Sequence, residues 1–165
     1  MVSATLFSSD VMDWQTPDDV LDVIRRMGPI ELDPCTSADN PTGALAHFTP
    51  AEDGLAKPWT SDGLVYVNPP YGRAMRLWMR KLRDEHQSGR VDEAILLIPA
   101  RTDTAAWAQY VALDAIAVAF WHGRIRFRRA PAGAPFPSAF VYYGFRPRAF
   151  RDAFREHASI MRFYQ

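Results

Sequence analysis

The residues best suited to chemistry are four that follow an apolar stretch, Asn68-Pro69-Pro70-Tyr71. Residues 64–67 before them are of types that favour a buried strand. The prolines cannot extend strand pairing, because each lacks an N–H group and has a fixed φ. The strand is therefore expected to stop at Asn68, with its side chain held in a defined direction. Ligands of open α/β sheets bind at the carboxyl ends of strands, so Asn68 is a candidate site residue.

This tetrapeptide resembles the catalytic motif of amino-methyltransferases, which move a methyl group from S-adenosylmethionine to an exocyclic or amide nitrogen. The lone pair of such a nitrogen is delocalised, so the nitrogen is a poor nucleophile. The Asn68 side-chain oxygen and the Pro69 carbonyl can accept its two N–H groups and localise that lone pair. Tyr71 can stack on a planar substrate, and a base reaches such a site only after leaving its helix. The alternative is a proline-rich turn after a core strand.

Length and composition predict one folded domain. The chain has 165 residues, of which 48% are hydrophobic and 13% aromatic, and we expect residues 1–165 to form a single unit with residues 1–13 as a loose arm. No apolar run has the length of a membrane span, and the first residues do not look like a signal peptide. The single cysteine, Cys35, excludes an internal disulfide and a cysteine-based metal cluster, and His122 lacks partners at metal-ligand spacing. We therefore expect a cytoplasmic protein without a metal.

Charge is divided between the two halves of the chain. Residues 1–70 have 3 basic and 11 acidic side chains, whereas residues 71–165 have 16 basic and 8 acidic ones. Such asymmetry indicates a polyanionic partner such as nucleic acid on one face. It is also compatible with two halves that neutralise each other within the fold.

The first 33 residues predict a helix followed by a short strand. Thr16 is a plausible N-cap of a helix from Pro17 to Met27; alternatively, Trp14 and Thr16 line a cofactor pocket. Residues 30–33 read as a strand that ends at Asp33. Its carboxylate can bind the amino-acid part or the ribose of a cofactor, or it can form an Asx turn. The glycine-rich loop that usually follows such a strand is missing.

The next segments predict a shortened sheet and a long helix. Only 34 residues separate Asp33 from Asn68, too few for two full strand–helix units. A helix is expected over residues 73–87, with apolar side chains at i, i+3, i+4 and i+7 spacing. Its opposite face is either a phosphate-contacting stripe or, as we prefer, a solvated face partly paired with Asp84; this face comprises Arg76, Arg80 and Arg83.

The remaining chain alternates apolar and polar segments. Strands are expected at residues 94–98, 115–120 and 138–143, the last of them being the final strand. One helix should follow a cap at Asp103 or Thr104, and another should extend over residues 146–157 with Phe150 and Phe154 on one face.

Arginines alternate with apolar residues between Arg124 and Arg129. This alternation predicts a half-buried strand with a basic face, and Arg124, Arg126 and Arg128 are candidate contacts to backbone phosphates. Phe127 can stack on an extruded base or pack in the core. Arg101 can contact a phosphate or pair with an acid of the first half. Residues 130–137 are expected to form a mobile lid.

Six segments occur together in one order: Trp14-x-Thr16-Pro17, Leu32-Asp33-Pro34-Cys35, Asp53-Gly54-Leu55 with Trp59, Asn68-Pro69-Pro70-Tyr71-Gly72, Pro99-Ala100-Arg101-Thr102-Asp103-Thr104, and Gly123-Arg124-Ile125-x-Phe127. In this combination, over roughly residues 10–145, the chain resembles the phage-encoded DNA N6-adenine methyltransferase (Dam-like) family. The first and fifth segments are more specific than Asn-Pro-Pro-Tyr, which many amino-methyltransferases share.

The resemblance implies a Rossmann-like class I methyltransferase fold, an α/β sheet that is mostly parallel with an antiparallel C-terminal hairpin and is somewhat abbreviated here. It implies S-adenosylmethionine as cofactor and double-stranded DNA as partner, in a bacterial host cell. The glycine-poor first loop agrees with this small family. By position, the resemblance assigns catalysis to Asn68, Pro69, Pro70 and Tyr71, and cofactor binding to Trp14, Thr16, Pro17, Asp33 and Asp53.

The sequence thus favours a DNA methyltransferase that acts on adenine N6 of a flipped base, by direct attack without a covalent enzyme intermediate. One alternative keeps the enzyme class and changes the acceptor to cytosine N4, RNA adenine or a glutamine amide; the basic second half argues against the last. The other is a catalytically silent nucleic-acid-binding domain.

Overall fold

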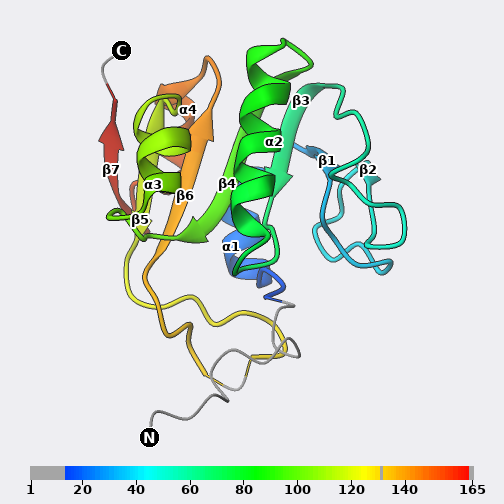
Figure 1. Ribbon diagram of the computed structural model, residues 1–165. Helices are drawn as coiled ribbons and strands as arrows, with labels where there is room; N and C mark the ends of the chain where they lie inside the picture. Colours follow the sequence, from blue (N-terminus) through cyan, green and yellow to red (C-terminus); the bar gives the residue numbers. More distant parts are fainter. Residues whose placement is uncertain (1–13, 131, 164–165) are drawn as a thin grey trace, which may run out of the picture.

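The computed structural model describes residues 14–130 and 132–163, and in these it contains one mixed seven-stranded sheet (Figure 1). The strand order is β2-β1-β3-β4-β6-β5-β7. The strands are β1 (Ile30–Asp33), β2 (Ala46–His47), β3 (Ser61–Val67), β4 (Val91–Pro99), β5 (Ala117–Trp121), β6 (Ser138–Tyr143) and β7 (Ala158–Arg162).

The sheet is parallel at one side and antiparallel at the other. β2, β1, β3 and β4 pair in parallel. β6 lies antiparallel between β4 and β5, and β7 pairs antiparallel with β5. The prediction of a mixed α/β sheet with a parallel centre and an antiparallel C-terminal part is confirmed.

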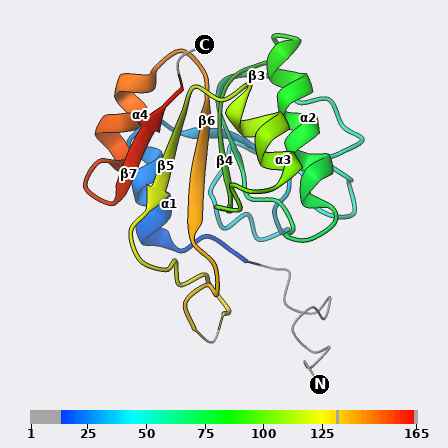
Figure 2. The same cartoon turned by 60° about the vertical axis from the view of Figure 1, so that its left-hand side comes forward.

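Helices cover both faces of this sheet (Figure 2). One face is covered by α1 (Asp18–Arg25) and α4 (Pro147–Phe154), whose apolar sides join one buried cluster. The other face is covered by α2 (Met75–Gln87), α3 (Ala105–Trp107) and the π-helical turn η3 (Ala108–Ala112). The central strands β3, from Leu64 on, and β4 are thus buried on both sides, which explains their continuous apolar runs.

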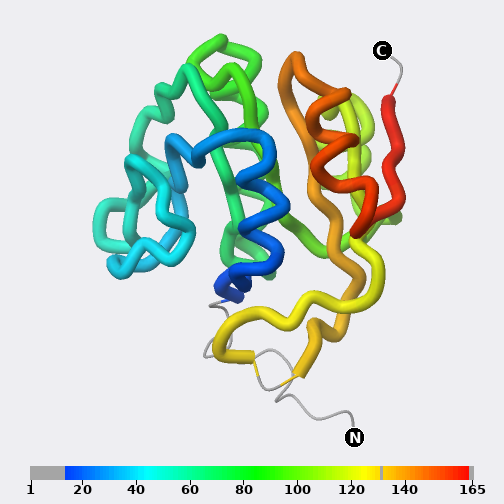
Figure 3. The backbone as a smooth tube through the Cα atoms, turned by 180° about the vertical axis from the view of Figure 1, so that it is seen from behind, coloured from blue at the N-terminus to red at the C-terminus, as the bar shows by residue number. Residues whose placement is uncertain are grey.

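The connection between β5 and β6, residues 122–137, extends beyond the carboxyl ends of β3 and β4 (Figures 1 and 3). The start of α1 reaches the same edge of the sheet. The two segments meet in an isolated antiparallel bridge between Gln15 and Arg128. Chain segments more than 100 residues apart therefore meet at the edge where Asn68 ends its strand.

Most of the predicted elements are confirmed. β6 has the predicted bounds, and α2 buries Trp78, Met79 and Leu82 as its spacing indicated. Thr104 caps α3 by accepting a hydrogen bond from the Trp107 N–H at 3.2 Å. Phe150 and Phe154 are both fully buried on α4. Residues 34–60 contain the two-residue strand β2 and no helix, in line with the short spacing between Asp33 and Asn68.

Three expectations were wrong. Residues 124–129 form no strand. Ile125 and Phe127 are buried, and Arg124 and Arg126 are exposed, as the alternation predicted. Within the described residues, however, this segment pairs with other backbone only in the single bridge between Arg128 and Gln15. The last helix ends at Phe154 rather than His157, because the chain turns there to begin β7. β6 is therefore not the final strand. The predicted loose arm, residues 1–13, lies outside the described residues.

No helix in the described part of the chain is both long enough and apolar enough to cross a membrane.

Candidate active site

Asn68 follows β3 directly, and its side-chain amide has a fixed orientation. Its Nδ2 donates to the carbonyl oxygen of Trp14 at 2.6 Å and to Thr16 Oγ1 at 3.1 Å. Its Oδ1 is buried and has no hydrogen-bond partner among residues 14–130 and 132–163. A buried acceptor without a partner is costly, so it marks a place where a ligand can donate.

Thr16 does not cap α1, which corrects the sequence prediction. Pro17 occupies the N-cap position, and no side-chain cap is present. The Thr16 hydroxyl instead lies 2.7 Å from the hydroxyl of Tyr66 and accepts from Asn68. The alternative, that this residue belongs to the pocket, agrees with the geometry because Trp14 and Thr16 both line the cavity described next.

A cavity of about 670 Å³ opens at the carboxyl ends of β1 and β3. Its volume lies within the range of small-molecule sites. Six of the residues predicted from sequence line it: Trp14, Thr16, Asp33, Asn68, Pro69 and Pro70. Three predicted residues are not in its lining, namely Pro17, Asp53 and Tyr71.

Asp33 is the buried acid of this cavity, with 2% of its surface exposed. Its Oδ1 accepts from the Cys35 backbone N–H at 3.1 Å, and its Oδ2 accepts from Thr42 Oγ1 at 2.9 Å. Burial raises the pKa of the Asp33 carboxyl to about 6, while these two hydrogen bonds oppose the rise. The hydrogen bond from the Cys35 N–H to the Asp33 side chain is that of an Asx turn, so this alternative is also correct in part. At neutral pH the cavity contains a desolvated carboxylate, which favours a cationic or hydroxyl-bearing ligand.

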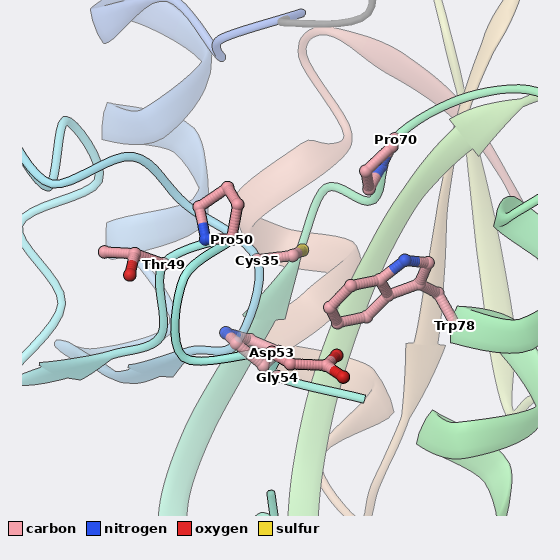
Figure 4. A pocket seen from close by; sticks show the side chains of 8 residues that line it. Cys35, Thr49, Pro50, Asp53, Gly54, Pro70 and Trp78 are labelled. Atoms are coloured by element: carbon pink, nitrogen blue, oxygen red, sulfur yellow. The ribbon is translucent and has the colours of Figure 1, made fainter. Parts of the chain in front are cut away.

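Asp53 lines a second, smaller cavity of about 110 Å³, which shares four lining residues with the large one, namely Cys35, Thr49, Pro50 and Pro70. Figure 4 shows its carboxylate directed toward the Trp78 ring. Asp53 has a φ of 53°, and its carboxylate accepts from the Leu55 N–H at 3.2 Å. A Cβ on Gly54 would lie 1.9 Å from the Pro34 carbonyl oxygen, so this turn packs tightly on the loop after β1. Asp53 therefore lies next to the main cavity but outside its lining.

Tyr71 is buried in a cluster of aromatic rings, with 6% of its surface exposed. Its ring stacks on Trp14 at 6.4 Å between centroids and meets the edges of Phe127 and Phe136 at 6.3 and 5.4 Å. Its hydroxyl has no hydrogen-bond partner within the described chain, and burial raises its pKa. Stacking of Tyr71 on a substrate therefore requires these rings to separate.

The predicted nucleic-acid contacts differ in their surroundings. Arg101, Arg124 and Arg126 are exposed. Arg128 forms an ion pair with Asp18, and Arg129 lies 4.0 Å from Asp39. Two arginines of this segment are thus engaged by acids of the first half, so the two halves do neutralise each other in part. Phe127 is 2% exposed and packs on Trp14, in agreement with the alternative that this residue packs in the core.

The arginines of α2 follow the preferred interpretation of a solvated face. Arg76 and Arg80 are exposed, and Arg83 pairs with Asp84 at 2.7 Å.

The sequence alone did not lead us to expect that the loop between β1 and β2 lines the cavity. Gln15 donates to Ser37 Oγ at 3.1 Å, which ties this loop to the segment before α1. The signal was present in the run of hydroxyl-bearing residues after the carboxyl end of β1, where ligands bind in open sheets. The residues of this loop in the lining are Cys35, Thr36, Ser37, Ala38, Pro41 and Thr42.

These features define an α/β protein with a ligand cavity at the carboxyl edge of its sheet, beside a buried amide oxygen that faces no protein donor. Residues 4–139 match the model of the DNA N-6-adenine-methyltransferase (Dam) family. The match covers most of the 165 residues, and the chain belongs to this family. No curated protein matches the chain significantly.

Proposed function

We propose that this protein transfers the methyl group of S-adenosylmethionine to N6 of an adenine that has rotated out of double-stranded DNA. The observation that supports this most is the buried Oδ1 of Asn68, which lacks a donor among the described residues. Asn68 itself lines a cavity of about 670 Å³. Family membership supports adenine N6 as the acceptor. We further propose that residues 1–165 form a single domain and that the sheet is of the Rossmann-like class I methyltransferase type.

The lining of the cavity fits the proposed cofactor. A nucleoside with an amino-acid arm is of a size that cavities of this volume accommodate. The Asp33 carboxylate can accept from the ammonium group or the ribose hydroxyls, and either contact would compensate its burial. Trp14 and Thr16 are proposed to contact the cofactor, with Pro17 shaping the start of α1. Asp53 is proposed to bind a part of the cofactor that extends into the smaller cavity.

The chain's own groups orient the amine. Asn68 Oδ1 accepts one N–H of the adenine amino group, and the Pro69 carbonyl accepts the other. This localises the nitrogen lone pair, while Pro70 keeps the backbone rigid. When bound, the cofactor would supply an electrophilic methyl carbon on a sulfonium centre. Transfer of this methyl to nitrogen would leave the electron pair of the broken sulfur–carbon bond on sulfur. The nitrogen then loses a proton to water, and catalysis rests on orientation and electrostatic stabilisation.

DNA binding must open the aromatic cluster before the base can enter. Tyr71 is proposed to stack on the base once Phe127 and Phe136 have moved. The exposed arginines at this edge are proposed to bind phosphates, namely Arg101, Arg124 and Arg126, together with Arg128 once it is released from Asp18. Residues 130–137 are proposed to act as the lid.

The experiment is transfer of labelled methyl from S-adenosylmethionine to unmodified duplex DNA, followed by nucleoside analysis. N6-methyladenine is the expected product. Duplex DNA that already contains N6-methyladenine serves as the matched control and should accept less label. N4-methylcytosine, or label on RNA alone, would replace the proposed acceptor. DNA binding without transfer to any nucleic acid would instead indicate a silent binding domain.

A further inference from the structure

The orientation of the Asn68 amide is decided by a residue 54 positions earlier. A backbone carbonyl oxygen can only accept a hydrogen bond, so the atom 2.6 Å from the Trp14 oxygen must be the amide nitrogen. The second hydrogen-bond acceptor, Thr16 Oγ1, lies 3.1 Å from the same nitrogen. Both N–H groups of Asn68 are therefore used, and Oδ1 is left for a ligand.

Tyr66 holds Thr16 in this arrangement. Tyr66 lies on β3 two residues before Asn68, so both side chains leave the strand on the same side. Its hydroxyl is 2.7 Å from Thr16 Oγ1, and the residue is completely buried. Burial raises the pKa of this phenol, which therefore stays protonated. Tyr66 does not line the cavity, so its effect on a ligand must pass through Thr16 and Asn68.

We infer that the Trp14 carbonyl, Thr16 and Tyr66 are positioning groups that aim Asn68 Oδ1 at the substrate amine, and that they make asparagine, not aspartate, the residue required at position 68. The inference extends the proposed function, since it concerns how the oxygen that accepts a hydrogen bond from the substrate amine is held. Aspartate has oxygens that accept an N–H at least as well as asparagine does. If acceptance alone mattered, either residue would serve.

An aspartate at position 68 conflicts with Trp14. Its carboxylate would place an anionic oxygen about where Nδ2 now lies, 2.6 Å from a carbonyl oxygen. Only the protonated carboxyl can donate to that oxygen and leave its other oxygen toward the substrate. Activity of Asn68→Asp should therefore rise as the pH falls, relative to the wild type.

The titratable groups around Asn68 determine how this pH profile is read. Asp33 and Cys35 line the same cavity as Asn68, and Tyr66 and Tyr71 lie two residues before it and three residues after it in the chain. Burial raises the pKa of Cys35, Tyr66 and Tyr71, so these groups stay neutral below pH 8. Burial raises the pKa of Asp33 to about 6 in the wild type. Each rate of the variant is therefore divided by the wild-type rate at the same pH.

The first test measures methyl transfer to DNA by Asn68→Asp and by the wild type between pH 6 and pH 8, at saturating cofactor. We expect the variant to be slower by about 100-fold at pH 8, comparable to the loss of one preorganised donor, and the ratio to increase steadily toward pH 6. A variant that equals the wild type, or a ratio that does not change with pH, would overturn the inference.

The second test removes single hydroxyl groups. Tyr66→Phe should lower kcat about tenfold and leave the KM for cofactor unchanged. Thr16→Val should lower kcat further, and Thr16→Ser should recover most of the loss because it restores the hydroxyl. Tyr143→Phe is the matched control: this buried phenol on β6 donates to the Tyr110 carbonyl at 2.5 Å, away from the cavity. Equal kcat for Tyr66→Phe and Tyr143→Phe would contradict a positioning role.

A third measurement does not depend on activity. Hydrogen exchange of the Asn68 side-chain amide, assigned by its loss in Asn68→Asp, should be slow in the wild type and faster in Thr16→Val. Fast exchange in the wild type would show that the amide is not held. If the wild type transfers no methyl group while this amide is protected, the proposed function fails and the positioning contacts stand.

Discussion

Arg128 donates a hydrogen bond to the carboxylate of Asp18, a residue 110 positions earlier in the chain. The contact joins the arginine-containing connection between β5 and β6 to the first turn of α1. Together with the Gln15–Arg128 bridge, it holds this connection against the segment that orients Asn68. The carboxylate of Asp18 thus occupies the position on Arg128 that a DNA phosphate is proposed to take.

Removal of this competing carboxylate should strengthen DNA binding. Asp18→Asn frees Arg128, so we expect several-fold tighter binding and a salt dependence that is steeper by about one unit in the log–log slope. Asp22→Asn is the control, because Asp22 lies on the same helix and pairs with Arg25 instead. Fluorescence anisotropy with duplex DNA at several salt concentrations makes the measurement. Equal gains for both variants would mean that only net charge matters.

Truncation of Asn68 should strongly reduce methylation and leave the fold intact. Asn68→Ala removes the proposed acceptor and with it a factor of about 100 to 1000 in kcat. The side chain lies after the end of β3, so circular dichroism and cofactor binding should be close to those of the wild type. Methyl transfer is measured on duplex DNA under single-turnover conditions. An active variant would remove the proposed mechanism.

Stability should depend on pH through Asp33. Its pKa in the folded protein is about 6, above the ordinary value of 3.8, so folding favours the protonated form. The stability that the protonated Asp33 contributes is fully present below pH 3.8 and is lost as the pH rises through 6. Asp33→Asn cannot ionise and should be more stable than the wild type at pH 8, by up to about 3 kcal/mol, with a difference that shrinks toward pH 4.

Urea unfolding of both proteins across this range measures the effect, and Asp62→Asn, at an exposed position of β3, serves as control. A pH-independent difference would show that Asp33 is not the titrating group. Because the same carboxylate is proposed to bind the cofactor, Asp33→Asn should also weaken cofactor binding at pH 8.

The ion pair between the buried Glu93 and Arg146 should matter for stability alone. Glu93, with its side chain 3% exposed, accepts from Arg146 and from the Tyr142 hydroxyl at the end of the sheet opposite Asn68. Arg146 is itself 42% exposed, and Arg146→Met leaves the buried carboxylate with the Tyr142 hydroxyl but without its cation, at a cost of about 1 to 3 kcal/mol in unfolding free energy. Arg148→Met changes an exposed arginine of α4 and should cost much less. Equal losses in urea unfolding would exclude a special role for the pair.

Local sequence patterns were sufficient for most of the framework. The apolar runs of β3, β4 and β6 predicted buried strands, because a strand covered on both faces has no polar side to reveal. The two prolines after Asn68 predicted where β3 stops. Motif order also predicted the family and six residues of the cavity lining.

Contacts between distant segments decided the remainder. Residues 124–129 alternate as a strand does, yet they have no partner strand, because pairing depends on which backbone lies alongside. The strands β2 and β7 were not predicted. β2 has only two residues, and β7 has five at the edge of the sheet, so neither shows a clear pattern of apolar and polar residues. The orientation of the Asn68 amide depends on the Trp14 carbonyl. The burial of Asp33 depends on the loop that brings Thr42 to it. The packing around Tyr71 depends on Phe127 and Phe136. Residue types therefore determined which chemistry is available. Only tertiary packing determined which atom of Asn68 is left without a hydrogen-bond partner, because the groups that bind its other atom lie far away in the chain.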